Sequence, residues 1–379
     1  MMSPMLIRMS VAILLLAACS DSPGSTPGPD ASTPDATADA AGDAASTGLT
    51  LLGRGLMSVA GDVAADPSRN LVAVNGFFGE NLVLFDVTDP SAPTELADID
   101  IGYNSDVQFA GTVLYVNHER LNRGFDIFDT STPSNPTLVR SIDQSAGSLA
   151  LNDCHNLWPQ PDRGLLYCAS TATGDVVVMA TGEGGVGSPT DPSFLTTIAS
   201  PNGGIGVHDV YALGDRLYVA FLDGGIAIYN INDATNPVLL GTQTYQDNFT
   251  HNVWPTTSGD YLFTTDEVIG GKLRVWDIRD PGDIKFVTSY GRNDGAVIHN
   301  VEIVGDRAYI SYYTEGLVVL DISDPTAPVE LGNDDFIDGP DVIDGEFFSA
   351  LRGAWGVEPA PPFIYVSDTT SGLRIYRMD

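Results

Sequence analysis

Histidine recurs at one position of a degenerate sequence repeat, and this recurrence is the strongest chemical signal in the chain. Four of the five histidines, His155, His208, His251 and His299, each stand two residues before an apolar residue, which a turn and a second apolar run follow. Imidazole is the commonest metal ligand in proteins and carries protons near neutral pH. Four copies could therefore build a site that no single repeat could form.

The repeat extends over seven units. Its anchoring apolar residues are Val63, Val107, Leu157, Val210, Val253, Val301 and Val357, roughly 43 to 56 residues apart. This period is typical of propeller blades and differs from that of helical solenoids. In the units without histidine, the histidine position holds Gly61, Ser105 or Trp355.

Each unit has the pattern of four short strands. In the fourth unit we expect strands over 207–211, 216–221, 226–231 and 238–245, with Gly, Asp, Asn and Pro in the turns between them. No helix-period stretch of useful length competes with this assignment. The sequence therefore predicts an all-β fold, a seven-bladed β-propeller of four-stranded antiparallel blades.

The last unit lacks its fourth strand. Leu51-Leu52-Gly53 resembles Leu239-Leu240-Gly241, which belongs to a fourth strand. An unpaired edge strand would be a template for aggregation. We therefore expect residues 49–58 to supply the missing strand and close the ring, which makes 49–379 the propeller domain.

The third strand and the turn after it carry a family resemblance. Residues 82–93 (LVLFDVTDPSAP) and 317–328 (LVVLDISDPTAP) resemble the LVIVD repeat of bacterial secreted and surface propellers, and looser copies occupy 125–136, 226–237 and 273–281. The resemblance covers nearly all of the chain from residue 51 onward. It implies a propeller scaffold and assigns no reaction.

The first residues resemble a lipoprotein signal peptide. A basic start and a short apolar run lead to Leu16-Ala17-Ala18-Cys19, which resembles a bacterial lipobox. This implies cleavage after residue 18 and a lipid on Cys19 that anchors the protein in a membrane; an ordinary cleaved signal is the alternative. Residues 20–48 contain only small or polar residues, which predicts a disordered tether over 19–48. We expect a location in the cell envelope, on the periplasmic or the outer side of the outer membrane.

The net charge of the chain argues against one class of partner. A formal charge of −33 disfavours nucleic acid as a binding partner, and we expect the protein to be a monomer.

The register of the predicted hairpin bears on the two remaining cysteines. If Leu157 faces Cys168 in a regular hairpin, Cys154 lies on the opposite face of the sheet and ~10 Å along the strand. This register argues against a disulfide between Cys154 and Cys168, and it favours two buried thiols.

First strands of propeller blades line the central channel, so His155, His208, His251 and His299 should meet at one mouth of it. His118, Glu119 and Trp355 are expected on the same face, around that centre. Two interpretations stay open. The four imidazoles could hold iron, copper or zinc, an arrangement similar to that of the carotenoid-cleaving oxygenases, although the local motifs differ. Alternatively, each histidine hydrogen-bonds the backbone of a neighbouring blade, as in WD-type repeats.

No sequence motif assigns a reaction. The chain contains no Gly-x-Ser-x-Gly elbow, no His-Glu-x-x-His zinc motif and no phosphate-binding loop followed by lysine. Our first expectation is a lipid-anchored scaffold that binds a protein or a glycan through its loop-rich face. The alternative is a metal-dependent enzyme, such as an oxidoreductase, that uses the four histidines.

Overall fold

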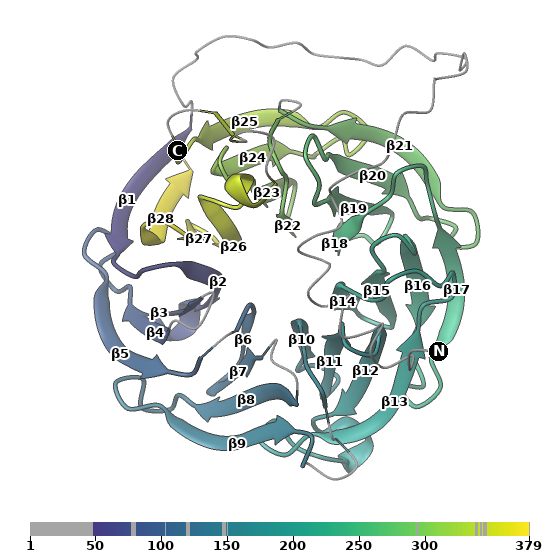
Figure 1. Cartoon of the computed structure of the whole chain (residues 1–379), viewed down its shortest axis with the longest axis horizontal. Helices are drawn as coiled ribbons and strands as arrows, with labels where there is room; N and C mark the ends of the chain where they lie inside the picture. Colours follow the sequence, from purple (N-terminus) through teal and green to yellow (C-terminus); the bar gives the residue numbers. More distant parts are fainter. Residues whose placement is uncertain are drawn as a thin grey trace, which may run out of the picture.

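The computed structural model describes residues 48–76, 81–102, 104–118, 122–145, 149, 151–292, 295–337, 340–341, 343 and 347–378. It confirms the seven-bladed β-propeller, because seven four-stranded antiparallel sheets form a ring (Figure 1). The helical segments described are short 3-10 turns: η1 (Pro67–Arg69), η3 (Glu183–Gly185) and η4 (Phe347–Ala350). In this part of the chain, no helix has the length and apolar character needed to cross a membrane.

The first three blades follow one another along the chain, and in each the strands run in order from the channel outward. Blade one contains β2 (Ala60–Asp66), β3 (Leu71–Gly76), β4 (Asn81–Asp86) and β5 (Thr94–Asp100). Blade two contains β6 (Val107–Ala110), β7 (Val113–Asn117), β8 (Arg123–Asp129) and β9 (Thr137–Asp143). Blade three contains β10 (Asn156–Gln160), β11 (Leu165–Ser170), β12 (Asp175–Ala180) and β13 (Ser193–Ala199).

The next three blades repeat this order. Blade four contains β14 (Asp209–Leu213), β15 (Arg216–Ala220), β16 (Ile226–Asn230) and β17 (Val238–Gln243). Blade five contains β18 (Thr250–Pro255), β19 (Tyr261–Asp266), β20 (Leu273–Asp277) and β21 (Lys285–Tyr290). Blade six contains β22 (Asn300–Val304), β23 (Arg307–Ser311), β24 (Leu317–Asp321) and β25 (Val329–Asp334).

Blade seven joins the two ends of the chain. It contains β26 (Ala354–Ala360), β27 (Phe363–Asp368) and β28 (Gly372–Met378), and its outer strand is β1 (Leu49–Gly55). β1 pairs antiparallel with β28, so that Leu51 lies opposite Tyr376 and Gly55 opposite Leu373. In Figure 1 the purple β1 lies beside the yellow β28. The predicted closure is confirmed, and it covers the edge that β28 would otherwise expose.

The hydrophobic core lies between neighbouring blades. For example, Val178 of β12 packs in one cluster with Val219 of β15 and Ala227 of β16, and all three are fully buried. Burying a side chain of the size of valine stabilises the folded state by roughly 1.5–3 kcal/mol. Because every blade packs on two neighbours, the first strands are held in fixed positions around the channel.

Aspartates after the third strands build the turns. The Oδ1 atom of Asp86 accepts the backbone N–H of Thr88 at 2.8 Å, and Oδ1 of Asp89 accepts that of Ser91 at 3.0 Å. Asp321 and Asp324 form the same two bonds in blade six. Part of the chain's acidity is therefore structural, because a short carboxylate can cap the turn that follows it.

Candidate functional site

Four histidine side chains from four consecutive blades lie side by side at one mouth of the central channel, with neighbouring ring planes inclined by 44–64°; we call this series the histidine stack. The ring centroids of His155 and His208 are 4.1 Å apart, those of His208 and His251 4.0 Å, and those of His251 and His299 4.5 Å. Trp355 of blade seven continues the series at 4.7 Å from His299. The structure thus brings together the four histidines that the repeat predicts.

A local irregularity of each first strand positions these imidazoles. In blade three, the N–H of His155 donates to the carbonyl of Ala169 in β11, and Asn156 is paired with the same Ala169. His208 and His299 have the same relation to Ala220 and Ser311 in their blades, and the register of β18 shifts at His251. The histidine is therefore the extra residue of a β-bulge, which redirects a side chain from the regular alternation of the strand.

The imidazoles are oriented by the backbone of the next blade. Nδ1 of His208 lies 3.1 Å from the carbonyl oxygen of His251, and Nδ1 of His299 lies 2.5 Å from that of Trp355. A carbonyl oxygen only accepts hydrogen bonds, so Nδ1 carries the hydrogen and Nε2 keeps the lone pair. In blade two, the hydroxyl of Ser105 donates to the carbonyl of His155 at 2.9 Å.

His251 differs from its neighbours because a carboxylate approaches it. Its Nε2 atom lies 3.4 Å from Oε2 of Glu267, the residue after β19. The backbone carbonyl of His299 acts to raise the pKa of His251, because it stabilises the protonated form of that ring. However, the buried Nδ1 atom of His251 forms no hydrogen bond of normal geometry with any described residue. Ligand atoms of His208, His251 and Glu267 all lie within 4.8 Å of one another. Among the described residues, these three form the group whose donor atoms could hold a metal ion.

Burial keeps the rings of His208, His251 and His299 neutral. It lowers the pKa of His208 and of His251 well below the ordinary value, and the neighbouring histidines lower both further. Burial likewise lowers the pKa of His299 to about 3. Neutral imidazoles offer a nitrogen lone pair, which is the form that binds metal ions.

A cavity of about 100 Å³ extends from the histidines into the channel. Its wall includes Glu267 and Trp355 together with the carboxyl-bearing residues Asp62, Asp106, Asp209 and Glu302. No lysine or arginine is among the described residues that line it. The site therefore offers nitrogen and oxygen donor atoms and, among its described residues, no positively charged side chain that would attract an anion.

Burial also shifts the carboxyl groups of the channel. It raises the pKa of Asp209 to about 7 and that of Glu358 to about 8, although Glu358 keeps some exposed surface. It raises the pKa of Glu302 well above the ordinary range, and the charge of Glu358 adds to this effect. Asp62 is raised by burial and then by the charge of Asp106. These groups hold protons at a pH at which free carboxylates have lost them.

Asp209 and Asn252, each of which directly follows a histidine, have a structural role. Oδ2 of Asp209 accepts hydrogen bonds from the Asn252 side chain at 2.6 Å and from the backbone N–H of Val253 at 3.4 Å. Oδ1 of Asn252 in turn accepts the N–H of Val301 at 3.1 Å. Each bond joins a blade to the next one, so Asp209 and Asn252 hold blades four, five and six together.

His118 lies apart from the histidine stack. Its Nε2 atom is 2.9 Å from Oδ2 of Asp126, and both side chains are buried. It does not line the cavity. Glu119, which we expected beside the centre, falls outside the described residues, as does Cys19. Of the three residues expected around the centre, Trp355 is the one that the structure places there.

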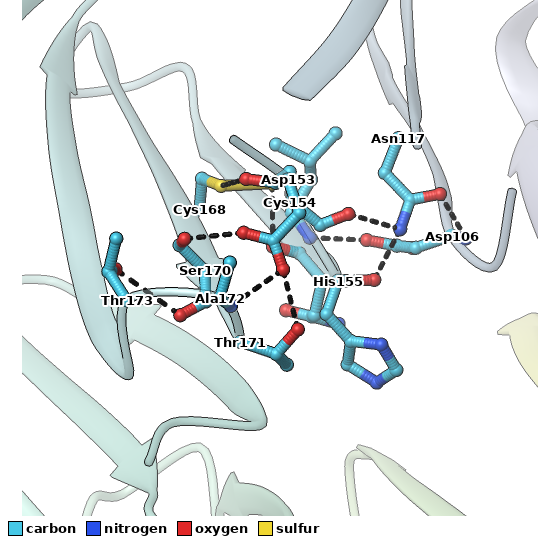
Figure 2. The surroundings of a disulfide bond; sticks show 12 residues. Asp106, Asn117, Asp153, Cys154, His155, Cys168, Ser170, Thr171, Ala172 and Thr173 are labelled. Atoms are coloured by element: carbon cyan, nitrogen blue, oxygen red, sulfur yellow. Dashed lines mark hydrogen bonds between the residues drawn. A yellow bond between two sulfur atoms is a disulfide. The ribbon is translucent and has the colours of Figure 1, made fainter. Parts of the chain in front are cut away.

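The prediction of two free thiols was wrong. Cys154 and Cys168 form a disulfide, with Cα atoms 5.7 Å apart (Figure 2). Leu157 does lie opposite Cys168, as expected. However, β10 begins at Asn156, and the bulge at His155 breaks the alternation that had placed Cys154 on the other face of the sheet.

The disulfide belongs to a network that fixes the backbone of His155. Asn117 of blade two donates from its side-chain amide to the carbonyl of Cys154 at 2.9 Å. On the other side, the carboxylate of Asp153 accepts Ser170 Oγ at 2.6 Å and the N–H of Ala172 at 2.8 Å. In Figure 2 the imidazole of His155 points away from the disulfide. The bonded segment therefore holds His155 while leaving its ring outside the network.

Sequence reasoning missed the second layer of channel residues. Trp158, Tyr211 and Trp254 pack together, with centroids 4.1–5.2 Å apart, and Glu302 and Glu358 continue the same layer in blades six and seven. All five stand three residues after the histidine position. That spacing was a usable signal, because the residue types at this position change from aromatic to acidic around the ring.

Comparison with known proteins identifies the repeat. The family model of the LVIVD repeat matches residues 101–144, 206–244 and 297–335, which contain the strands of blades two, four and six. None of the curated proteins matches the chain. The protein therefore carries LVIVD repeats within a seven-bladed β-propeller.

Proposed function

We propose that this protein is a lipid-anchored propeller of the bacterial cell envelope that binds a transition-metal ion at the mouth of its central channel. The observation that carries the proposal is the stack of four imidazoles, 4.0–4.5 Å apart, on the wall of a cavity without described lysine or arginine. Iron, copper and zinc all accept imidazole ligands.

The contacts between blades do not by themselves require histidine. Ser105 occupies the histidine position of blade two and donates to the next blade's carbonyl with a hydroxyl, as His208 does with Nδ1. A small hydroxyl residue thus meets the structural need. His208 and His299 supply something more, namely Nε2 lone pairs fixed in orientation by the bond at Nδ1, which is how metal-binding histidines are commonly held.

The location is proposed from the sequence. The lipobox-like segment that ends at Cys19 supports lipid attachment, and the tether over 19–48 would let the propeller stand away from the membrane. We propose the outer membrane as the site of attachment.

Metal analysis tests the proposal. The full-length chain, purified without a polyhistidine tag, should contain iron, copper or zinc, or take it up at micromolar concentration. His251→Ala should lose most of the metal, because this residue lies in the middle of the stack. Affinity should fall as the pH is lowered, since protons compete for the ring nitrogens. A wild-type protein that takes up none of these ions would contradict the proposal.

A second candidate function is docking of a protein partner on the same face. Loops on the face of the propeller that carries the connections between blades expose Leu56, Ile205, Ile269, Ile343 and Phe348, each by 40% or more. Exposed apolar side chains on one face favour an interaction surface there. A photo-crosslinker at position 56 should then capture a defined partner in cells, whereas one at exposed position 238, on the outer strand β17, should not. Equal labelling at both positions would argue against this docking face.

A further inference from the structure

We infer that the metal is held by His208, His251 and Glu267, and that its remaining coordination positions open into the channel cavity. The inference rests on the metal binding proposed above and departs from a symmetrical centre of four histidines. It assigns Glu267 as a ligand and Tyr313 as the residue that positions it.

The spacing of the donor atoms supports this ligand set. Donor atoms of the three residues lie within 4.8 Å of one another, and His155 and His299 are not part of the group. Bonds of about 2.0–2.2 Å in a tetrahedral site place two ligand atoms about 3.4 Å apart. The distance from Nε2 of His251 to Oε2 of Glu267 is 3.4 Å, longer than an ordinary hydrogen bond. The pair is therefore spaced as two ligands of one ion.

The two outer histidines contact the rings that bind. His155 packs against His208, and His299 packs against His251, with centroids 4.1 and 4.5 Å apart. Nδ1 of His299 is bound to the carbonyl of Trp355. Such contacts restrict how the two inner imidazoles can turn. We therefore assign His155 and His299 a packing role beside the metal.

Tyr313 holds the carboxylate in place. Its hydroxyl donates to Oε1 of Glu267 at 2.5 Å, which leaves Oε2 facing His251. The ring of Tyr313 is fully buried and packs 4.7 Å from that of His299. Its backbone has a φ of 34°, a conformation that bulky residues rarely adopt. Leu222 has a similar φ of 43° at the equivalent loop position of blade four, so this turn belongs to the repeat, and the hydroxyl bound to Glu267 is what distinguishes Tyr313.

Three protein ligands leave room for another molecule. Sites that exchange ligands keep an open position, whereas closed sites with four protein ligands are structural. Here the open side faces the cavity of about 100 Å³, whose wall includes Asp106, Asp209 and Glu302. The described residues of this wall include no lysine or arginine to neutralise an anion, so the molecule that binds should be a small uncharged donor, such as water or imidazole.

Calorimetric titration with Zn²⁺ and Co²⁺ tests the ligand set on the full-length chain without a polyhistidine tag. Glu267→Gln, His208→Gln and His251→Gln should each lower affinity by about 100-fold, and Tyr313→Phe by about 10-fold. His155→Gln and His299→Gln should each change it by less than about 10-fold. Glu315→Gln is the matched control, because Glu315 lies on the corresponding loop of blade six and pairs with Arg292.

Folding is checked separately by circular dichroism, and Glu267→Gln and Tyr313→Phe preserve side-chain shape if a histidine variant does not fold. Co²⁺ also reports coordination: its visible absorption should change when imidazole is added and should respond far less to azide. Equal dependence on all four histidines with a dispensable Glu267 would overturn the ligand set while leaving the metal-binding proposal intact. An unchanged Co²⁺ spectrum with imidazole would overturn the open position. Absence of binding by the wild-type chain would defeat both proposals.

Discussion

Nε2 of His251, in β18, lies 3.4 Å from Oε2 of Glu267, the residue that follows β19 in the same blade. β18 and β19 place Thr250 opposite Asp266, and the register then shifts before Asn252. His251 is therefore the extra residue at this point, and Glu267 follows directly after the paired Asp266. The hairpin thus brings a nitrogen ligand and an oxygen ligand together within the blade, on the wall of the channel cavity.

The closure of the ring gives a first prediction. Deleting residues 49–58 removes β1 and exposes β28, so the melting temperature should fall steeply and the protein should aggregate. Deleting residues 20–47, which contain no large apolar residue, should leave the melting temperature nearly unchanged. Thermal unfolding of the two truncated proteins makes the comparison. Equal stability would show that β1 is not needed for closure.

The membrane anchor gives a second prediction. If Cys19 carries the lipid, Cys19→Ser should leave an unprocessed or soluble protein in place of one that partitions into detergent with the membrane fraction. Fractionation of cells followed by immunoblotting provides the measurement. Membrane partition that is the same for both proteins would mean that lipidation of Cys19 is not the anchor.

The disulfide in blade three gives a third prediction. Cys154 and Cys168 are separated by 14 residues, and a crosslink over a loop of this size stabilises the folded state by about 3 kcal/mol. The variant Cys154→Ala/Cys168→Ala should lose about this much unfolding free energy in a urea titration. A reductant should destabilise the wild-type protein and leave the variant unaffected. Insensitivity of the wild type to reduction would contradict the assigned role.

The buried carboxyl group of Glu358 gives a fourth prediction. Burial raises its pKa from 4.5 to about 8, so between these values the folded protein keeps a proton that the unfolded chain has lost. The unfolding free energy should therefore fall as the pH rises through this window, by at most about 1.4 kcal/mol per pH unit from this group. Glu358→Gln should flatten that dependence. Glu95→Gln, at an exposed position of β5, is the control and should leave the slope as it is.

The sequence alone determined the architecture and the location of the site. Periodic strands, Asp-containing turns and the anchor residues from Val63 to Val357 predict seven blades, and β1 completes the last blade as Leu51-Leu52-Gly53 indicated. The recurrence of histidine on four units was enough to place His155 and His299 at the two ends of one stack. Both predictions follow from the order of residues along the chain, because a sequence repeat shows which residues occupy equivalent positions in successive blades.

Only the tertiary structure decided the details that matter chemically. The bulge at each histidine changes which way a side chain points, and no local sequence signal distinguished it from a regular strand. It made the register argument about Cys154 fail, and it turned His251 toward Glu267. The shared environment of Glu302 and Glu358 likewise arises only when different blades meet at one axis. Such contacts depend on how distant strands pack around the channel, which the spacing of residues along one strand does not specify.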